Sequence, residues 1–515
     1  MSDAKEGMKL SLKVITNKER NKVLFAEADN HFVDILLSFL TLPLGRVFKV
    51  LDNHRGDNEA VTIGSLSSLY HSVANLDSSL FVTEGAKEAL LNPKSSFEDE
   101  HKRLKLDIAE FQPYEFFYCP SGCSIFLSES MYYDNAGQCL KCRYGFSSMK
   151  KEVVKKVPQA AFEDGVFTMY RSSFVISDDL QIFPNLTGLC QIFSILGIAD
   201  TDEGEAIEVT IGLNEMLRLL KASLISPTPL SNLILNKASL VLDSEPKASV
   251  NQIEIQENPK SKNMVLKVVV RKSSGKFLYA QAEKDFVEFL FGLLFIPVGG
   301  VHHLLSGETC IKAIDNLYRS AADLIHDKYF RSPGTKNRLM KPNVVHGCIS
   351  ENYILPLDQE CLPDEYTKFC GFSSSMFPKG QGRYLYEATT YMVMDDLTVT
   401  PFCVYSVFSS LNEQKIPRSD LKEMEVQVGL KEIVDLLKRS LLSKTPLTDV
   451  IVCVINKNTG YVLEDILLDK IELESTSSKR MTGREDFVDF ILSFLTIPLG
   501  GVVSLFEGQD LFQEH

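Results

Sequence analysis

Four cysteines in one short stretch are the residues of this chain whose types and spacing suit a definite chemistry. Cys119 and Cys123 are separated by three residues, and Cys139 and Cys142 follow in a CLKC motif. Two such pairs can wrap their sulfurs around one Zn²⁺ ion, with Zn–S distances of about 2.3 Å. Four thiolates leave no open coordination position, so the spacing predicts structural zinc rather than catalytic zinc. Two other interpretations stay open, namely reduced cysteines without metal and thiol redox chemistry.

The chain that carries these cysteines repeats itself. Residues 212–230 return as residues 429–447, with 12 of 19 positions identical. A second segment, FVDILLSFLTLPLG at residues 32–45, reappears at 286–299 and again at 487–500. The repeats predict tandem copies of one module. The predicted boundaries are 8–245 for the first module, 264–470 for the second and 484–515 for a partial third copy.

The second copy lacks the cysteine pattern. GFSSM after Cys142 aligns with GFSSSM after Cys370, but Thr367 stands where a CxxC motif needs its first cysteine. We therefore expect zinc in the first module only, in a zinc-ribbon-like insertion at residues 114–148. So small a segment has little core, and bound zinc contributes about 10 to 16 kcal/mol toward folding such a site.

An acidic pair is the other repeated feature with chemical potential. Asp178 and Asp179 correspond to Asp395 and Asp396. Adjacent carboxylates can bind a divalent cation or act as acid and base. However, successive residues in a strand point to opposite faces, which spoils a shared site. We favour an aspartate-supported turn or a helix cap before the following proline.

The elements that must position these residues follow from apolar periodicity and turn residues. Each copy opens with a predicted β-hairpin, turned near Asn21 or Gly275, and continues with a helix that Pro43 or Pro297 breaks. Further predicted elements are helices at 68–76, 213–224, 316–324 and 430–441, broken strands at 174–184 and 391–401, and linkers at 92–105 and 243–263. Hairpins and helices without a regular βαβ rhythm predict an α+β fold.

Several of these segments together resemble a known family. The KVLFAEA strand, the FVDILLSFLTLPLG helix, the aspartate pair before a proline and the TPL tail are similar to a plant family known only as a domain of unknown function, DUF674. The resemblance covers nearly the whole chain in tandem copies. It implies an early cysteine cluster, and it brings no established activity or substrate.

Composition narrows the classes of function. The net charge of −14 argues against a polyanion as the default partner. The longest apolar runs, about 13 residues, fall short of the 20 or so that span a bilayer. The amino terminus lacks a signal-peptide core, so we expect a cytoplasmic or nuclear protein with reduced cysteines.

We expect a non-enzymatic intracellular interaction protein with a structural zinc site and an unknown protein partner. One alternative is an enzyme of unknown reaction, with its site between the modules. Another is nucleic-acid binding through the ribbon and the lysines beside it, which are Lys150, Lys151, Lys155 and Lys156.

Overall fold

A computed structural model of the chain describes residues 8–53, 62–82, 84–109, 115–118, 125–126, 151–152, 165–170, 172–185, 188–198, 204–235, 263–324, 326–345, 348–350, 354–359, 384–386 and 390–459. The chain divides into two compact units. The first holds the described residues as far as Ile455 except the turn Ser273–Gly275, and that turn belongs with the residues from Asn456 onward. Within the first unit we call residues 8–235 the first half and residues 263–272 with 276–455 the second half.

The first half builds a five-stranded antiparallel sheet in the order β7-β6-β2-β1-β8. Its strands are β1 (Leu10–Asn17), β2 (Lys22–Asp29), β6 (Ser173–Ser177), β7 (Ile182–Pro184) and β8 (Glu205–Ile211). Leu12 and Val14 are fully buried while Lys13 between them is exposed, because successive side chains in a strand point to opposite faces. The predicted hairpin of β1 and β2 is confirmed, and Asn21 turns it with a φ of 46°.

The second half builds a sheet of the same order, β12-β11-β10-β9-β13. Its strands are β9 (Met264–Arg271), β10 (Phe277–Ala282), β11 (Tyr391–Met394), β12 (Val399–Pro401) and β13 (Leu421–Val428). The predicted hairpin is confirmed again, with Gly275 at a φ of 63°. The edge strands β8 and β13 were not predicted, because acidic residues such as Glu208 and Glu425 are uncommon inside strands. The predicted α+β class is confirmed.

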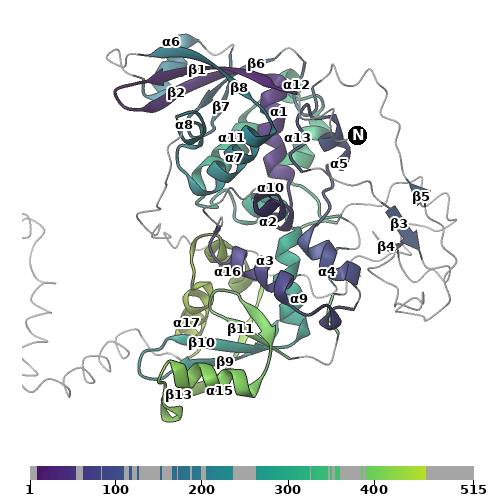
Figure 1. Cartoon of the computed structure of the whole chain (residues 1–515), viewed down its shortest axis with the longest axis vertical. Coiled ribbons are helices and arrows are strands. Elements are labelled where there is room, and N and C mark those ends of the chain that lie inside the picture. The colour runs from purple at the N-terminus through teal and green to yellow at the C-terminus, as the bar shows by residue number, and fades with distance from the viewer. Residues whose placement is uncertain are drawn as a thin grey trace, which may run out of the picture. The chain divides into compact units, whose positions relative to one another are not determined.

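Two broken helices lie in the space between the two sheets (Figure 1). The first comprises α1 (Asn30–Ser38), η1 (Phe39–Thr41) and α2 (Leu44–Asn53), and the second comprises α9 (Lys284–Gly292), η5 (Leu293–Phe295) and α10 (Val298–Leu304). Each breaks at its predicted proline, Pro43 or Pro297, because proline has no N–H and its ring clashes with the preceding turn.

The two breaks pair with each other. Leu44 donates its backbone N–H to the Ile296 carbonyl at 3.0 Å, and Val298 donates to the Leu42 carbonyl at 2.9 Å. These bonds form an isolated antiparallel bridge in which each half contributes the same residues of the repeat. The bridge therefore relates the two halves by local pseudo-twofold symmetry.

Each half also packs one of its helices against the sheet of the other half. In the first half, α3 (Leu66–Asn75) contacts α9 and the edge strand β12, whereas α11 (Lys312–Asp323) of the second half contacts α1 and the edge strand β7 (Figure 1). Ser72 of α3 accepts a hydrogen bond from the Val399 N–H at 3.0 Å. Its counterpart Ser320 of α11 accepts one from Ile182 at 2.9 Å. The halves are therefore reciprocally interlocked.

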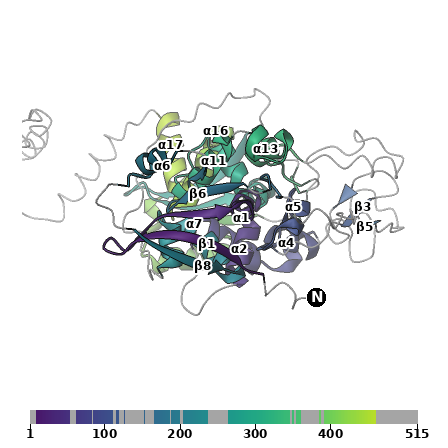
Figure 2. The same ribbon diagram turned by 90° about the horizontal axis from the view of Figure 1, so that it is seen from above.

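One continuous apolar cluster fills the space between the sheets and contains residues of both halves, from Leu12 of β1 to Leu437 of α16 (Leu430–Leu442). Seen from above, β1, β6 and β8 lie over α1, α2 and α7 (Leu213–Ile225) (Figure 2). A shared core means that neither half buries its own apolar surface alone.

The remaining elements are α4 (Glu84–Leu91), α5 (Glu98–Arg103), α6 (Leu189–Leu196), α8 (Pro229–Ile234), α12 (His326–Tyr329), α13 (Pro333–Met340), α15 (Val404–Glu413), α17 (Pro446–Thr459), η2 (Ser78–Leu80), η7 (Arg418–Asp420), β3 (Glu115–Tyr118), β4 (Ile125–Phe126) and β5 (Lys151–Glu152). The prediction of a linker at residues 92–105 is wrong, because this segment contains α5 and the fully buried residues Phe97 and His101. Charged residues are frequent in the segment, and for that reason the sequence did not indicate that some of its positions are buried.

Candidate functional site

The four predicted zinc ligands, Cys119, Cys123, Cys139 and Cys142, lie outside the described residues. The short strands β3 and β4 flank the first pair, and Tyr118 is paired with Ile125 in antiparallel register. The two ends of the segment that holds Cys119 and Cys123 are therefore side by side. Elsewhere in the described part of the chain, no group of three or more His, Cys, Asp or Glu side chains is arranged to hold a metal ion.

The described residues that lead into the cysteine segment are tied down by buried polar groups. Arg46 of α2, which is 6% exposed, donates from its guanidinium to the Ala109 carbonyl. Asp107 accepts a hydrogen bond from the Ala109 N–H at 3.1 Å. Arg103 of α5 reaches across to the Val166 carbonyl at 3.2 Å, on the far side of the segment. These hydrogen bonds therefore fix described residues on both sides of the cysteine segment.

Asp34 of α1 binds the described residues that follow the cysteine segment. Its carboxylate accepts from the N–H groups of Val166 at 2.6 Å, Phe167 at 3.1 Å and Thr168 at 2.8 Å. It also accepts from the Thr168 hydroxyl at 2.8 Å. Burial raises the pKa of Asp34 to about 6, against the opposing effect of these four donors. The buried carboxylate thus acts as a clamp for residues 166–168.

Glu288 of α9 is the equivalent clamp in the second half. Its carboxylate accepts from the N–H groups of Tyr384 at 2.8 Å and Leu385 at 3.0 Å. Burial raises the pKa of Glu288 as well. Sequence reasoning missed both clamps. A usable signal was present, because a single acidic residue interrupts the same position of the repeated apolar helix in each copy.

The repeated aspartates act as helix caps and turn supports, as we favoured from the sequence. Asp178 accepts from the N–H and the hydroxyl of Ser231 in α8, each at 2.7 Å. Asp395 accepts in the same way from the N–H of Thr448 in α17 at 2.8 Å and from its hydroxyl at 2.5 Å. Burial raises the pKa of both carboxyl groups. Each aspartate therefore caps the start of a helix that is distant in sequence.

The second aspartate of each pair has a different role. Asp179 accepts from Ser177 and forms an ion pair with Lys312 at 3.0 Å. Burial opposes ionisation, but these partners lower the pKa of Asp179. Asp396 accepts from the Thr398 N–H within its own turn. The two carboxylates of a pair thus serve different partners, which does not suit a shared catalytic site.

Replacing Asp178 or Asp395 by alanine should lower the free energy of unfolding by about 1 to 3 kcal/mol each, because a helix start loses its acceptor. Urea denaturation followed by circular dichroism measures the change. Asp396→Ala is the matched control, with an expected loss below about 1 kcal/mol, since its bonds are local. Equal losses in all three variants would contradict the assigned roles.

One buried histidine has neighbours that resemble a catalytic triad. His101 Nε2 lies 2.8 Å from the Thr41 hydroxyl, and His101 Nδ1 lies 3.7 Å from Asp107. Both His101 and Thr41 are fully buried, and the Thr41 hydroxyl donates to the Ser38 carbonyl. A substrate therefore has no path to the hydroxyl, and the arrangement is structural.

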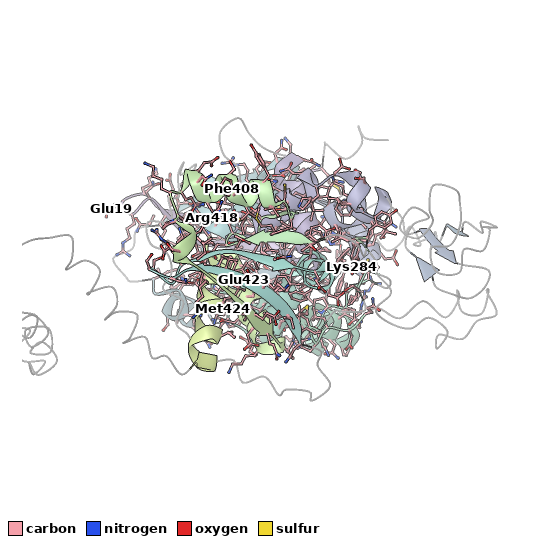
Figure 3. The ribbon with its side chains drawn as sticks, turned by 90° about the horizontal axis from the view of Figure 1, so that it is seen from below. Glu19, Lys284, Phe408, Arg418, Glu423 and Met424 are labelled. Carbon is pink, nitrogen blue, oxygen red and sulfur yellow. The ribbon has the colours of Figure 1, made fainter. Side chains whose placement is uncertain are left out.

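Exposed apolar side chains gather on α15. This helix covers the outer face of the second sheet and packs Leu411 against a small cluster that includes Val269. The same helix exposes Val404, Tyr405 and Phe408, by 73%, 79% and 44%. The Arg418 guanidinium lies 5.1 Å from the Phe408 ring, and both side chains appear at this face in Figure 3. The result is an apolar surface with a cationic border.

Among the described residues, no helix combines the length and apolar character that a membrane span requires. Comparison with curated proteins found no match, and comparison with solved structures found none. A family model described as "Protein of unknown function (DUF674)" matches residues 6–420 and, in a second match, residues 371–513. These matches cover most of the chain, and the motifs that suggested the resemblance lie within them. The chain therefore belongs to the DUF674 family.

Proposed function

We propose that this protein is a non-enzymatic intracellular interaction protein, acting in the cytoplasm or the nucleus, that binds a protein partner through α15. The observation that carries the proposal is the exposure of the neighbouring side chains Val404, Tyr405 and Phe408 on α15. Aromatic residues grouped in this way are typical of protein-binding surfaces. The Arg418 guanidinium beside Phe408 favours a partner whose apolar surface has an acidic border.

The second part of the proposal is a structural zinc ion in the first module, bound by Cys119, Cys123, Cys139 and Cys142. The paired-cysteine spacing supports it. The pairing of β3 with β4 is consistent with a small inserted element. The hydrogen bonds of Arg46 and Asp34 hold the described residues on either side of it. The identical order of the two sheets supports the tandem modules that this view requires.

The enzyme alternative has weaker support, because the repeated aspartates cap helices and the Thr41–His101 pair is buried. Nucleic-acid binding depends on lysine side chains outside the described residues. It predicts an affinity that falls steeply as the salt concentration rises.

Substitutions on α15 test the binding surface. Tyr405→Ser and Phe408→Ser together should reduce capture of the specific partner at least tenfold, while the melting temperature changes by less than about 2 °C. Val265→Ser is the matched control, since Val265 is 51% exposed on another element. The partner, identified by mass spectrometry, is purified and its affinity is measured with each variant. Equal affinity for the α15 variant and the wild type would refute the surface.

Metal analysis of the full chain tests the zinc site. The purified protein should contain one zinc per chain, and Cys119→Ser or Cys142→Ser should abolish it. Cys190→Ser is the control, because Cys190 is exposed on α6 and should leave the zinc content unchanged. A wild-type protein without zinc, prepared without chelators, would overturn this part of the proposal.

A further inference from the structure

A crevice of about 440 Å³ lies where α11, a helix of the second half, packs against the edge strand β7 of the first sheet. Ile182–Pro184 form one wall, and Arg319, Ser320 and Asp323 of α11 form the other. Lys328 and Tyr329 complete the lining. The volume matches that of sites for small organic molecules. The crevice exists only because a helix of the second half packs against the sheet of the first half.

Two cations of this lining lack an ionic partner among the residues that the structure describes. Neither Arg319 nor Lys328 forms a salt bridge with a described residue. Burial raises the pKa of Asp315, and the positive charge of Arg319 partly opposes that rise. Lys328 Nζ lies 5.3 Å from the centre of the Tyr329 ring. Asp323 is the acidic residue of the lining, so the cations outnumber it. The charge balance of the crevice therefore favours an anion.

A buried hydroxyl adds a hydrogen-bond donor. Ser320 is 7% exposed, and its oxygen accepts from the Ile182 N–H. The proton of this hydroxyl has no acceptor among the described residues. Its counterpart Ser72 in α3 also accepts a backbone N–H, but it donates to the Ser68 carbonyl at 2.8 Å. Ser320 is thus left with a donor that a ligand in the crevice can use.

The equivalent helix of the first half lacks the charges. In the aligned segments SLYHSVAN and NLYRSAAD, His71 stands where α11 has Arg319, and Asn75 stands where it has Asp323. The two helices occupy equivalent places on the two sheets. The charged residues are therefore not needed for the helix to pack against an edge strand.

We propose that this crevice binds a small organic anion, a carboxylate or a phosphate ester, with its charged group between Arg319 and Lys328 and within reach of the Ser320 hydroxyl. The apolar body of the ligand packs against Phe183 and Tyr329. Charge-assisted hydrogen bonds to a guanidinium are among the stronger polar contacts in proteins, which makes Arg319 the main anchor. The proposed site uses no residue of α15 and none of the four cysteines, so its failure is distinguishable from failure of the proposed function.

Isothermal titration calorimetry on the full chain tests the site with benzoate and phenyl phosphate as probes and benzyl alcohol as the neutral analogue. We expect at least one anion to bind, more weakly at high salt, and the alcohol to bind at least tenfold more weakly. Arg319→Gln and Lys328→Gln should each weaken the anion at least tenfold, which corresponds to about 1.4 kcal/mol. Lys267→Gln, on the outer face of the second sheet, should change nothing.

The preference between benzoate and phenyl phosphate identifies the anionic group. Both substituted residues are surface-exposed, so the variants should keep the wild-type melting temperature, and a scan verifies this. Equal affinity of the wild type and Arg319→Gln for the anion would overturn the proposal, as would equal affinity for the neutral alcohol. Binding of neither anion at millimolar concentration would overturn it as well.

Discussion

Two fragments that divide the chain after Lys247, at the predicted linker between the modules, will purify as a stable one-to-one complex when produced together. Neither will be soluble in its native form when produced alone. The reason is the exchange of helices, because α11 covers the edge strand of the first sheet and α3 covers that of the second. The shared apolar core would be exposed in a single half. Gel filtration of the co-produced fragments should show one complex, with a Kd below about 1 μM.

A glycine at the contact between the halves offers a sharper test. Gly64 has a φ of 46°, and a Cβ built there would lie 2.3 Å from the Ser440 carbonyl oxygen. Gly64→Ala in the first fragment should weaken the complex at least tenfold, because backbone atoms cannot move away cheaply. Gly188→Ala is the matched control, since nothing lies within 4 Å of the added methyl group. Independent folding of both isolated halves would refute the exchanged arrangement.

This exchange also decides how zinc should be assayed. A metal assay on the isolated second half would be ambiguous, because that half loses α3 and the cover of its edge strand. Cysteine substitutions in the full chain avoid the difficulty.

Removing the carboxylate of Asp34 should lower the free energy of unfolding strongly. Asp34→Ala leaves the N–H groups of Val166, Phe167 and Thr168 without their carboxylate acceptor in a buried site. Unsatisfied buried donors cost about 1 to 3 kcal/mol each before relaxation, so we expect a loss of about 3 to 5 kcal/mol in the free energy of unfolding. Glu27→Ala, on the exposed face of β2, should cost less than about 1 kcal/mol. Urea denaturation at pH 7 measures both.

The same carboxyl group gives a pH signature. Its pKa is about 6 in the folded state, against the usual 3.8 of an aspartate, so the folded state binds the proton more tightly. The contribution of Asp34 to stability therefore rises as the pH falls from 7 toward 4, by about 1 kcal/mol between pH 7 and pH 5. Asp34→Ala should lack this increment. An identical pH dependence in both proteins would contradict the raised pKa of Asp34.

The elements that could be predicted are those with local causes. The hairpins turn at Asn21 and Gly275, and the central helices break at Pro43 and Pro297. A positive φ and a missing N–H act within a few residues, so these features are readable in any window of the sequence. The sequence predicted that Asp178 and Asp395 support a turn or a helix cap, but it did not predict which helices they cap. Those helices lie 53 residues further along the chain.

By itself the sequence determined the family, the α+β class, the repeated elements and the spacing of the four cysteines. Only the tertiary structure decided which sheet each helix covers, where Asp34 and Glu288 clamp the chain, and that Arg319 faces a crevice. The physical reason is that α3 and α11 carry nearly the same apolar face, so each suits either sheet. That choice depends on packing between residues far apart in the chain, and no local pattern records it.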